Sequence, residues 1–384
     1  MNNQEIRMQT KDLYMQVVES KSDLKDFIKL PWQIYQDDPN WVPPLIMERK
    51  EFLDRKKNPF FRHADVVFYL AKQNGKTVGR IAGIVNFNHI KTHQENVGFF
   101  GLFECLKDFE IAKALLDSVR DWLKSKGMEI MRGPANFSSN EDWGFLLEGF
   151  DSPPAIMMTY NPPYYLDFMD AYGMVKVKDL YAYYMDKNIH PPDRVVRMAE
   201  SIKKKENIKI RTIDMKDFEN EVKRIKQIYN SAWSKNWGFI PMTDEEFDHL
   251  AKNLKLIVDP NLVFIAEVED KLAGFSLALP DFNQVQIKLN GKLFPTGILK
   301  LLWHTKISKK INGVRIITLG VVPEFQKRGI DTVFYVETFN LGVKRGYIWG
   351  EMSWILEDNI LMNRMLELLG ATLYKKYRLY EIKI

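Results

Sequence analysis

The segment from residue 316 to residue 344 has the residue types and spacing of an anion-binding turn. An apolar strand predicted over 316–322 runs into Pro323, and a helix is predicted over 332–344. The first N–H groups of a helix lack partners within it, and the helix dipole adds positive charge there. Gln326, two cationic residues (Lys327 and Arg328) and the flexible Gly329 lie between this strand and this helix. These residue types suit the binding of a pyrophosphate. A P-loop is excluded because the Gly-Lys-Ser/Thr ending is missing, and an ordinary strand-turn-helix is the alternative.

The order of strand, Val-x-Pro, Gln-x-x-Gly and helix resembles the acetyl-CoA loop of the GNAT N-acetyltransferases. That loop has the pattern Gln/Arg-x-x-Gly-x-Gly/Ala, which Gln326 and Gly329 match. Asp331 departs from it, since a small residue is usual there and a carboxylate repels a pyrophosphate unless it points away or caps the helix. The resemblance covers about residues 209–384 and suggests a tandem GNAT-like protein of an uncharacterised bacterial type. It implies acetyl-CoA or another acyl-CoA as the donor.

The resemblance also implies which residues contact the donor. It places the thioester carbonyl near the backbone of the predicted strand's end, with the pantetheine arm alongside. It maps the family's pantetheine-binding Asn to Asn359, which precedes a helix predicted over 360–369. The expected donor-binding residues are Gly320, Val321, Val322, Gln326, Lys327, Arg328, Gly329, Ile330, Asp331 and Asn359.

Acyl transfer to an amine needs a base for the ammonium proton and an N–H group that holds the carbonyl oxygen. Glu351 and Glu357 are the candidate catalytic bases, and Glu324 is a weaker one; each has a surface or capping alternative. Many GNAT enzymes carry a Tyr general acid in the last helix, where this chain has Leu366. Tyr374, Tyr377 and Tyr380 lie nearby in sequence but belong to a final strand predicted over 373–384.

The two halves of the chain show the same order of elements. A strand over 97–103, a helix over 109–126 and Gly127 correspond to the strand, helix and Gly346 of the second half. The expected fold class is α/β, an α+β mixed sheet in each of two tandem GNAT-like acyl-CoA N-acyltransferase domains. We expect a degenerate domain over 1–190, a linker with a helix from Asp193 over 191–208, and a CoA-binding domain over 209–384. Each domain is expected to form its own sheet.

The first half lacks the anion-binding turn but has a long connection, residues 133–163, without a regular pattern. Loops of this length are usually functional or disordered, and the aromatic and Pro residues here argue against disorder. The hypothesis is that the connection helps to bind the acceptor, and the alternative is that it only packs the domains together. The candidate substrate residues in the two halves are Asn140, Trp143, Tyr160, Trp233 and Trp237.

Composition excludes several other classes. The chain of 384 residues is 46% hydrophobic and has a net charge of +5. It has no apolar run long enough to cross a membrane and no secretory signal, so a cytoplasmic protein is expected. Cys105 is alone, which excludes a disulfide framework. His89 and His93 lie in a segment, residues 86–95, that we interpret as a polar loop, so we expect no metal site there. We interpret His304 as a packed side chain.

These observations favour transfer of an acetyl or other acyl group from CoA to a small-molecule or other amine acceptor. Two alternatives are a non-catalytic acyl-CoA-binding or regulatory protein, suggested by Asp331 and Leu366, and an aminoacyl-tRNA-dependent transferase. Apart from tRNA, no nucleic acid partner is expected, because the basic run at 203–205 is typical of a solvated helix end. The oligomeric state is not fixed by the sequence.

Overall fold

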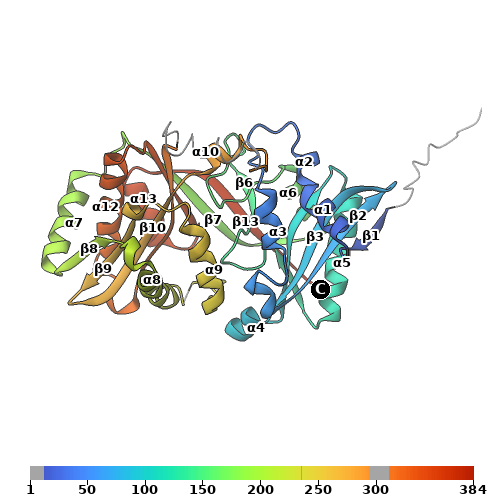
Figure 1. Cartoon of the computed structure of the whole chain (residues 1–384), viewed down its shortest axis with the longest axis horizontal. Helices are drawn as coiled ribbons and strands as arrows, with labels where there is room; N and C mark the ends of the chain where they lie inside the picture. Colours follow the sequence, from blue (N-terminus) through green and yellow to red (C-terminus); the bar gives the residue numbers. More distant parts are fainter. Residues whose placement is uncertain (1–12, 235, 294–310) are drawn as a thin grey trace, which may run out of the picture.

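A computed structural model describes residues 13–234, 236–293 and 311–384, so His304 lies outside the described residues. Within them the strands form one mixed sheet of 13 strands in the order β1-β2-β3-β4-β5-β13-β7-β12-β11-β10-β9-β8, and β6 pairs with β13 (Figure 1). The strands are β1 (Tyr14–Val17), β2 (Ala64–Gln73), β3 (Lys76–Asn86), β4 (Val97–Cys105), β5 (Ile130–Gly133), β6 (Phe145–Glu148), β7 (Val175–Asp186), β8 (Ile208–Thr212), β9 (Val263–Val268), β10 (Lys271–Pro280), β11 (Gly313–Val321), β12 (Trp349–Leu356) and β13 (Thr372–Lys383).

Helices cover the sheet and mark the two halves of the chain. Figure 1 shows the helices of the first half at one end of the molecule and those of the second half at the other. The α-helices are α1 (Lys21–Lys29), α2 (Pro31–Ile34), α3 (Ile46–Phe52), α4 (Phe87–His93), α5 (Phe109–Ser125), α6 (Tyr164–Tyr172), α7 (Asp193–Lys205), α8 (Phe218–Ala232), α9 (Asp244–Leu254), α10 (Asn283–Gln286), α12 (Ile330–Lys344) and α13 (Ile360–Leu368). None of these helices combines the length and the apolar character needed to cross a bilayer.

The two halves repeat one pattern of strand pairing. In the first, β3 and β4 are antiparallel and β4 pairs with β5 in parallel; in the second, β10 and β11 are antiparallel and β11 pairs with β12 in parallel. Helices α5 and α12 connect the parallel strands, as the sequence predicted. Both antiparallel pairs also contain a register shift of the kind that a β-bulge makes.

The expectation of two separate sheets is wrong, because the last strands of the two halves are exchanged. Strand β13 lies between β5 and β7, and β7 lies between β13 and β12. The physical reason is packing: Tyr377 and Leu379 of β13 are fully buried among first-half residues, whereas Tyr183 of β7 is buried among second-half residues. The single sheet therefore crosses the predicted domain boundaries. The division of the chain into residues 1–190, 191–208 and 209–384 remains a prediction.

The interpretation of residues 86–95 as a polar loop is also wrong, since helix α4 occupies most of this segment. The side chain of Asn86 accepts hydrogen bonds from the N–H groups of Asn88 and His89, which caps the helix start. The ring centroids of His89 and His93 lie 4.6 Å apart, and His89 Nε2 lies 2.7 Å from Glu95 Oε1. Among the described residues, no group of three or more His, Cys, Asp or Glu side chains could hold a metal ion.

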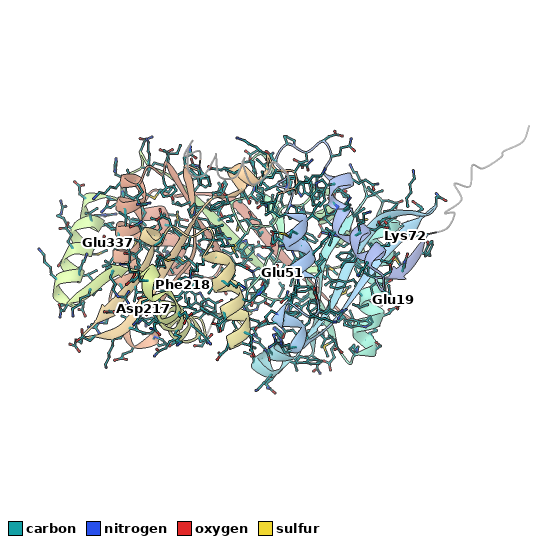
Figure 2. All side chains as sticks on the ribbon, in the orientation of Figure 1. Glu19, Glu51, Lys72, Asp217, Phe218 and Glu337 are labelled. Carbon is teal, nitrogen blue, oxygen red and sulfur yellow. The ribbon has the colours of Figure 1, made fainter. Side chains whose placement is uncertain are left out.

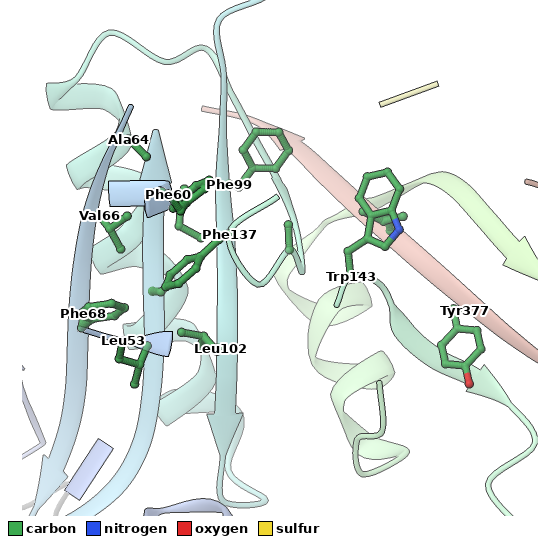
Figure 3. Close-up of a cluster of buried hydrophobic side chains, with 14 of the residues drawn as sticks. Leu53, Phe60, Ala64, Val66, Phe68, Phe99, Leu102, Phe137, Trp143 and Tyr377 are labelled. Carbon is green, nitrogen blue, oxygen red and sulfur yellow. The ribbon is translucent and has the colours of Figure 1, made fainter. Parts of the chain in front are cut away.

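A large aromatic cluster anchors the first half against the long connection. Phe137, from this connection, stacks on Phe60 at 4.9 Å and lies among residues of β2 and β4 (Figure 3). Trp143 and Tyr377 belong to the same cluster, where they lie nearer the second half. The connection is therefore part of the core, and it contains the short strand β6.

Candidate functional site

Strands β11 and β12 separate at their carboxyl ends. Their parallel pairing runs from Gly313 opposite Trp349 to Ile316 opposite Met352, and no pairing follows. The shift between β10 and β11 leaves Ile317 as the extra residue, immediately before the separation. We call the gap between the unpaired ends of β11 and β12 the splay. It leaves one edge of β11 without a neighbouring strand, which is where an extended ligand can pair.

The turn between β11 and α12 has the backbone that an anion site needs. Gly329 has φ of 80° and Lys327 has φ of 63°, so the chain bends sharply before the helix. In the described structure, the N–H groups from Lys327 to Thr332 have no hydrogen-bond acceptor outside α12. The Gln326 side chain donates to Val321 O at 3.1 Å and ties the turn to the strand. We call residues 326–331 the cradle.

Two acidic groups lie at this cradle. Asp331 is the second residue of α12 and makes no cap, because the cap position belongs to Gly329. Arg328 donates from Nε to Glu206 Oε2 at 2.7 Å, at the end of α7. Helix α7 packs along α12 at two points. Ile202 of α7 faces Gly329, and Lys203 Nζ lies 2.6 Å from Glu337 Oε1 of α12, which is labelled in Figure 2. The sequence did not show that α7 borders the cradle.

The end of β11 presents a backbone donor to the splay. Val322 N–H is bound to Ala273 O of β10 at 2.9 Å, so it is not free for a ligand. Because hydrogen bonds alternate along an antiparallel pair, the N–H groups of Leu319 and Val321 face the open edge. On the face of the sheet beside Gly320, the Trp233 ring fills the space that a side chain would need.

Glu351 is fully buried and belongs to a network just before the splay. Its Oε1 accepts from Ser353 Oγ at 2.5 Å, and its Oε2 accepts from the Tyr374 hydroxyl. Arg315 lies 3.6 Å from Glu351 and donates to Ser353 Oγ at 2.9 Å. Arg315 also donates to the carbonyls of Ile156 and Met157, both at 2.8 Å, so the long connection touches this network.

A second carboxyl group, Asp281, faces the same network. It is 4% exposed, and burial raises its pKa to about 7; the nearby Glu351 carboxylate raises the pKa too, while the Ile156 N–H lowers it. A carboxyl group that titrates near neutral pH is suited to proton transfer. Asp281 and Tyr374 line a pocket of about 570 Å³, within the usual range for ligand sites, whose other walls include Pro154, Asn283 and Trp349.

The other candidate bases are placed differently. Glu357 Oε2 pairs with Lys176 at 2.6 Å and its Oε1 accepts from Asp179 N–H at 3.0 Å. Glu324 is exposed and pairs with Lys271 at 3.1 Å. Asn359 caps α13 by accepting from Met362 N–H at 3.3 Å. Glu357 and Asn359 are thus held by groups away from the pocket, whereas Glu351 is linked to the pocket through the hydroxyl of Tyr374.

Three of the five predicted substrate residues, Asn140, Trp143 and Trp237, lie between the halves, and Trp233 packs within the second half against Phe275. Trp143 and Trp237 stack at 5.5 Å, and Asn140 accepts from the Tyr229 hydroxyl at 2.8 Å while donating to Ile240 O at 3.0 Å. Tyr229 in turn contacts Trp233, at 4.9 Å. Both polar atoms of the Asn140 side chain are therefore used to join the halves.

The fifth predicted substrate residue, Tyr160, lies apart from these four. Its hydroxyl donates to Asp38 Oδ2 at 2.9 Å, and its carbonyl accepts from the Tyr35 hydroxyl. Tyr160 therefore fastens the long connection to the opening segment of the chain.

The first half has a corresponding gap between β4 and β5, which its own chain fills. Ala135 N–H donates to Phe100 O at 2.8 Å, and Asn136 Oδ1 accepts from Leu102 N–H at 2.8 Å. A side chain at Gly101 would collide with Ala135 O, at 1.9 Å. The chain thus occupies the edge that an added ligand would use.

Sequence reasoning missed Arg315, Ser353, Asp281 and Tyr374. Tyr374 was set aside because it lies in the last strand, and the strand exchange is what brings it to Glu351. Asp281 ends a predicted apolar stretch and gave no sign in the sequence that it would be buried. The one local signal was a charged Arg315 at the start of an apolar strand, since a buried guanidinium requires a partner.

The backbone at the cradle fits an acyl-CoA pyrophosphate, because its donors are unpaired and Lys327 and Arg328 lie beside them. In a comparison with known proteins, no protein-family model matches the chain. Protein YghO of Escherichia coli (strain K12) is 38% identical over 370 residues, 95% of this chain and 94% of that protein. The bacterial ceramide synthase of Caulobacter vibrioides (strain NA1000 / CB15N) is 38% identical over 379 residues, 96% of this chain and 97% of that protein.

Among solved structures, the fold is similar to a tandem GNAT protein from the clavulanic acid biosynthesis pathway. The TM-score is 0.58 at 10% identity, over 97% of this chain and 98% of that one. An identity this low shows the fold alone, and it agrees with the two GNAT-like halves described above. The chain has a tandem GNAT fold, and it belongs to the protein family that includes protein YghO and the bacterial ceramide synthase.

Proposed function

We propose that this chain transfers an acyl group from an acyl-CoA to an amine. The observation that carries the proposal is the cradle of unpaired N–H groups directly after the open edge of β11. The cradle suits the pyrophosphate of CoA, and the open edge suits the amide groups of the pantetheine arm. The donor, when bound, supplies a carbonyl carbon that is activated by a thioester.

The residues near the splay have distinct roles in this proposal. Val321 and Leu319, whose N–H groups face the open edge, are placed to hold the carbonyl oxygen as it gains negative charge. The pair formed by Glu351 and Asp281 takes up the single proton that the attacking ammonium group must lose. As the C–N bond forms and the C–S bond breaks, the CoA thiolate leaves with a second proton from the amine nitrogen. Arg315 and Ser353 hold Glu351 in place, and the Tyr374 hydroxyl stays protonated because burial and Glu351 raise its pKa.

The acceptor enters, in this proposal, through the pocket that Asp281 and Tyr374 line. Its walls are partly polar, with Asn283 and Gln284, and partly apolar, with Pro154, Ile287 and Trp349. Such walls suit an amine on an amphiphilic molecule. The relative named bacterial ceramide synthase, by its name, forms ceramide, which is a fatty acyl amide of a long-chain amino alcohol. We therefore propose a long-chain amino alcohol as the acceptor class.

The first half, in this proposal, binds no donor, because residues 133–136 fill its gap. The roles of Asn140, Trp143, Trp233 and Trp237 toward the acceptor remain predictions. Asn140, Trp143 and Trp237 pack between the halves, and Trp233 packs within the second half.

A thiol-release assay with mass spectrometry of the product tests this function. The purified chain is incubated with acetyl-CoA or hexadecanoyl-CoA and a panel of amines from ethanolamine to a long-chain amino alcohol. We expect free CoA and the amide in equal amounts, and loss of both products in the Glu351→Gln variant. Binding of acyl-CoA without amide formation for any amine would instead support a non-catalytic acyl-CoA-binding protein.

A further inference from the structure

Helix α7 carries a row of basic side chains on its exposed face. Their spacings along the helix are three, seven and eleven residues, close to one, two and three turns, so the side chains share one face. In the part of the chain that the structure describes, none of the four forms an ion pair, although Lys203 of the same helix does. We call these four exposed residues the basic row: Arg194, Arg197, Lys204 and Lys205.

The acidic residues of α7 do not cancel this row. Asp193 is the first residue of the helix, where the helix dipole favours a carboxylate. Glu200 lies at the margin of the row, beside Arg197 and Lys204, and forms no ion pair with either of them in the described structure. The exposed face of α7 therefore keeps a net positive charge, and its charges are free to meet a partner.

The basic row borders the candidate donor site. The last turn of α7 adjoins the cradle, because Ile202 faces Gly329 and Glu206 accepts from Arg328. Lys205 directly precedes Glu206, so the row starts beside the cradle and runs away from it along the helix. Figure 1 shows α7 at the outer end of the second half, where a second protein can approach its exposed face.

The cradle itself offers backbone donors but little net charge from side chains. Lys327 and Arg328 are balanced by Asp331 and by Glu206, which is held against Arg328. Free CoA brings a pyrophosphate and a further phosphate on its ribose, whereas the phosphopantetheine arm of a carrier protein brings one phosphodiester. A donor with a single phosphate at the cradle and its other negative charges over α7 matches this distribution of charge.

The basic row suits an acidic protein better than a lipid surface. Met198, 41% exposed, is the one large apolar side chain exposed on this fully described helix. A helix that lies in a membrane interface buries an apolar face in lipid, but the apolar face of α7, with Val195 and Ala199, already packs in the core of the second half. Attraction between a basic and an acidic protein surface needs no free apolar face.

We propose that an acidic acyl carrier protein delivers the donor: it docks on the basic row, while its acylated phosphopantetheine arm passes the cradle and lies along the open edge of β11. This inference rests on the proposed function, because the arm occupies the site assigned there to the same arm of acyl-CoA. The reaction is unchanged. The amine forms the amide bond, the thioester C–S bond breaks, and the leaving thiolate, which takes a proton from the amine nitrogen, stays on the carrier's arm.

Steady-state kinetics with three donors that carry the same dodecanoyl group tests the docking. The donors are a purified bacterial acyl carrier protein, free phosphopantetheine and CoA, each as the dodecanoyl thioester, with a long-chain amino alcohol as the acceptor. We expect the KM for the carrier to be at least about tenfold lower than the KM for free phosphopantetheine, because only the carrier contacts the basic row. Raising the NaCl concentration from about 50 to about 400 mM should remove most of this difference, since salt screens exposed charges.

Reversal of two charges locates the effect on α7. Arg197→Glu combined with Lys204→Glu should raise the KM for the carrier at least about tenfold and leave the KM for free phosphopantetheine within about twofold. The matched control combines Lys25→Glu with Lys124→Glu, the same change of charge at exposed positions of α1 and α5 in the first half, and it should leave both KM values unchanged. If the α7 variant does not fold, as judged by circular dichroism, Arg197→Gln with Lys204→Gln takes its place.

The outcomes separate this inference from the proposed function. Equal KM values for the carrier and for free phosphopantetheine, or equal effects of the two double variants, would overturn the docking while leaving acyl transfer in place. Binding of anionic lipid vesicles or of tRNA that depends on the basic row, without binding of the carrier, would also overturn it. Absence of the amide with all three donors would overturn the proposed function, and the role of the carrier with it.

Discussion

At the scale of single residues, the account depends on two carboxyl groups that the fold buries beside one splayed strand pair. Glu351 is 0% exposed and Asp281 is 4% exposed. Buried carboxyl groups are retained only with partners: Arg315, Ser353 and Tyr374 supply them to Glu351, and the N–H groups of Ile156 and Asn283 supply them to Asp281. Perturbed titration in a pocket is a feature of functional sites, although structural networks share it.

The first prediction is that Glu351→Gln lowers the turnover number by about 10²–10⁴, the usual contribution of a positioned general base. CoA affinity, measured by calorimetry, should not change, because Glu351 lies away from the cradle. The matched control is Glu357→Gln, the same chemical change six residues later in a group paired with Lys176. If Glu357→Gln abolished turnover and Glu351→Gln did not, the assignment of the base would be wrong.

The second prediction concerns the pH dependence of stability. Folding raises the pKa of Asp281 from 3.8 to about 7, so between these values the folded state binds more protons than the unfolded state. Stability therefore falls as pH rises from about 4 to 7, and the loss from this group is at most about 4 kcal/mol, from 1.36 kcal/mol per pH unit. Asp281→Asn should flatten that part of the urea-unfolding profile measured across this range. An unaltered profile would show that Asp281 is already ionised in the folded state.

At the scale of elements, α12 and α7 together set the charge at the cradle. Lys327 and Arg328 are positive there, while Asp331 and Glu206 are negative, and Glu206 is held against Arg328. A helix start favours anions, yet this one carries an acidic side chain in its first turn. Affinity for a pyrophosphate is therefore expected to be lower than the backbone alone would allow.

The third prediction is that Asp331→Ala tightens CoA binding by on the order of 1 kcal/mol, about fivefold, because it removes a partly exposed repulsive charge. It should also lower thermal stability slightly, since the carboxylate favours the start of the helix. Glu337→Ala is the control, because it removes the same charge two turns further along α12. If Asp331→Ala and Glu337→Ala raised CoA affinity equally, the gain would come from the change in net charge and not from the position of Asp331 at the cradle.

Much of the element order could be predicted from the sequence, because caps and glycines mark the ends of the elements locally. Helix α13 begins after Asn359 and stops before Gly370, and α7 begins at Asp193 as expected. Helix α4 was missed because its start depends on one side chain, Asn86, in a polar segment. The candidate site was predicted only in part: the cradle is contiguous in sequence, whereas Arg315, Ser353, Asp281 and Tyr374 meet only through tertiary structure.

At the scale of the whole molecule, the exchange of β7 and β13 makes the two halves dependent on each other. Each of these strands supplies core side chains to the other half, and they also pair with one another. Pairing between strands so far apart in sequence has no local signal, which explains why two separate sheets were expected. The same exchange places the splay, the acidic pocket and the long connection close together.

The fourth prediction is that residues 1–208 and 209–384 do not fold when produced separately. Each fragment would lose the strand that completes its core and would expose an open sheet edge, which favours aggregation. Produced together, the two fragments should form a complex with the circular dichroism spectrum of the intact chain. A soluble, cooperatively unfolding fragment would contradict the account of the exchanged strands.

The fifth prediction is the most direct test of the central claim, that the cradle at the start of α12 binds CoA. Calorimetry is used to compare CoA binding to the wild-type chain, Gly329→Glu and Gly329→Asn. The Asn side chain tolerates the positive φ at this position and meets the same Ile202 contact, but it carries no charge. It therefore controls for strain.

Lys327→Glu adds negative charge at an exposed position of the cradle without changing a glycine, and Lys344→Glu makes the same change at the far end of the helix. The account predicts that Gly329→Glu and Lys327→Glu lose at least about tenfold in CoA affinity, whereas Gly329→Asn loses less and Lys344→Glu is unchanged. Equal CoA affinity in the wild-type chain, Gly329→Glu and Lys327→Glu would contradict it and move the donor site elsewhere.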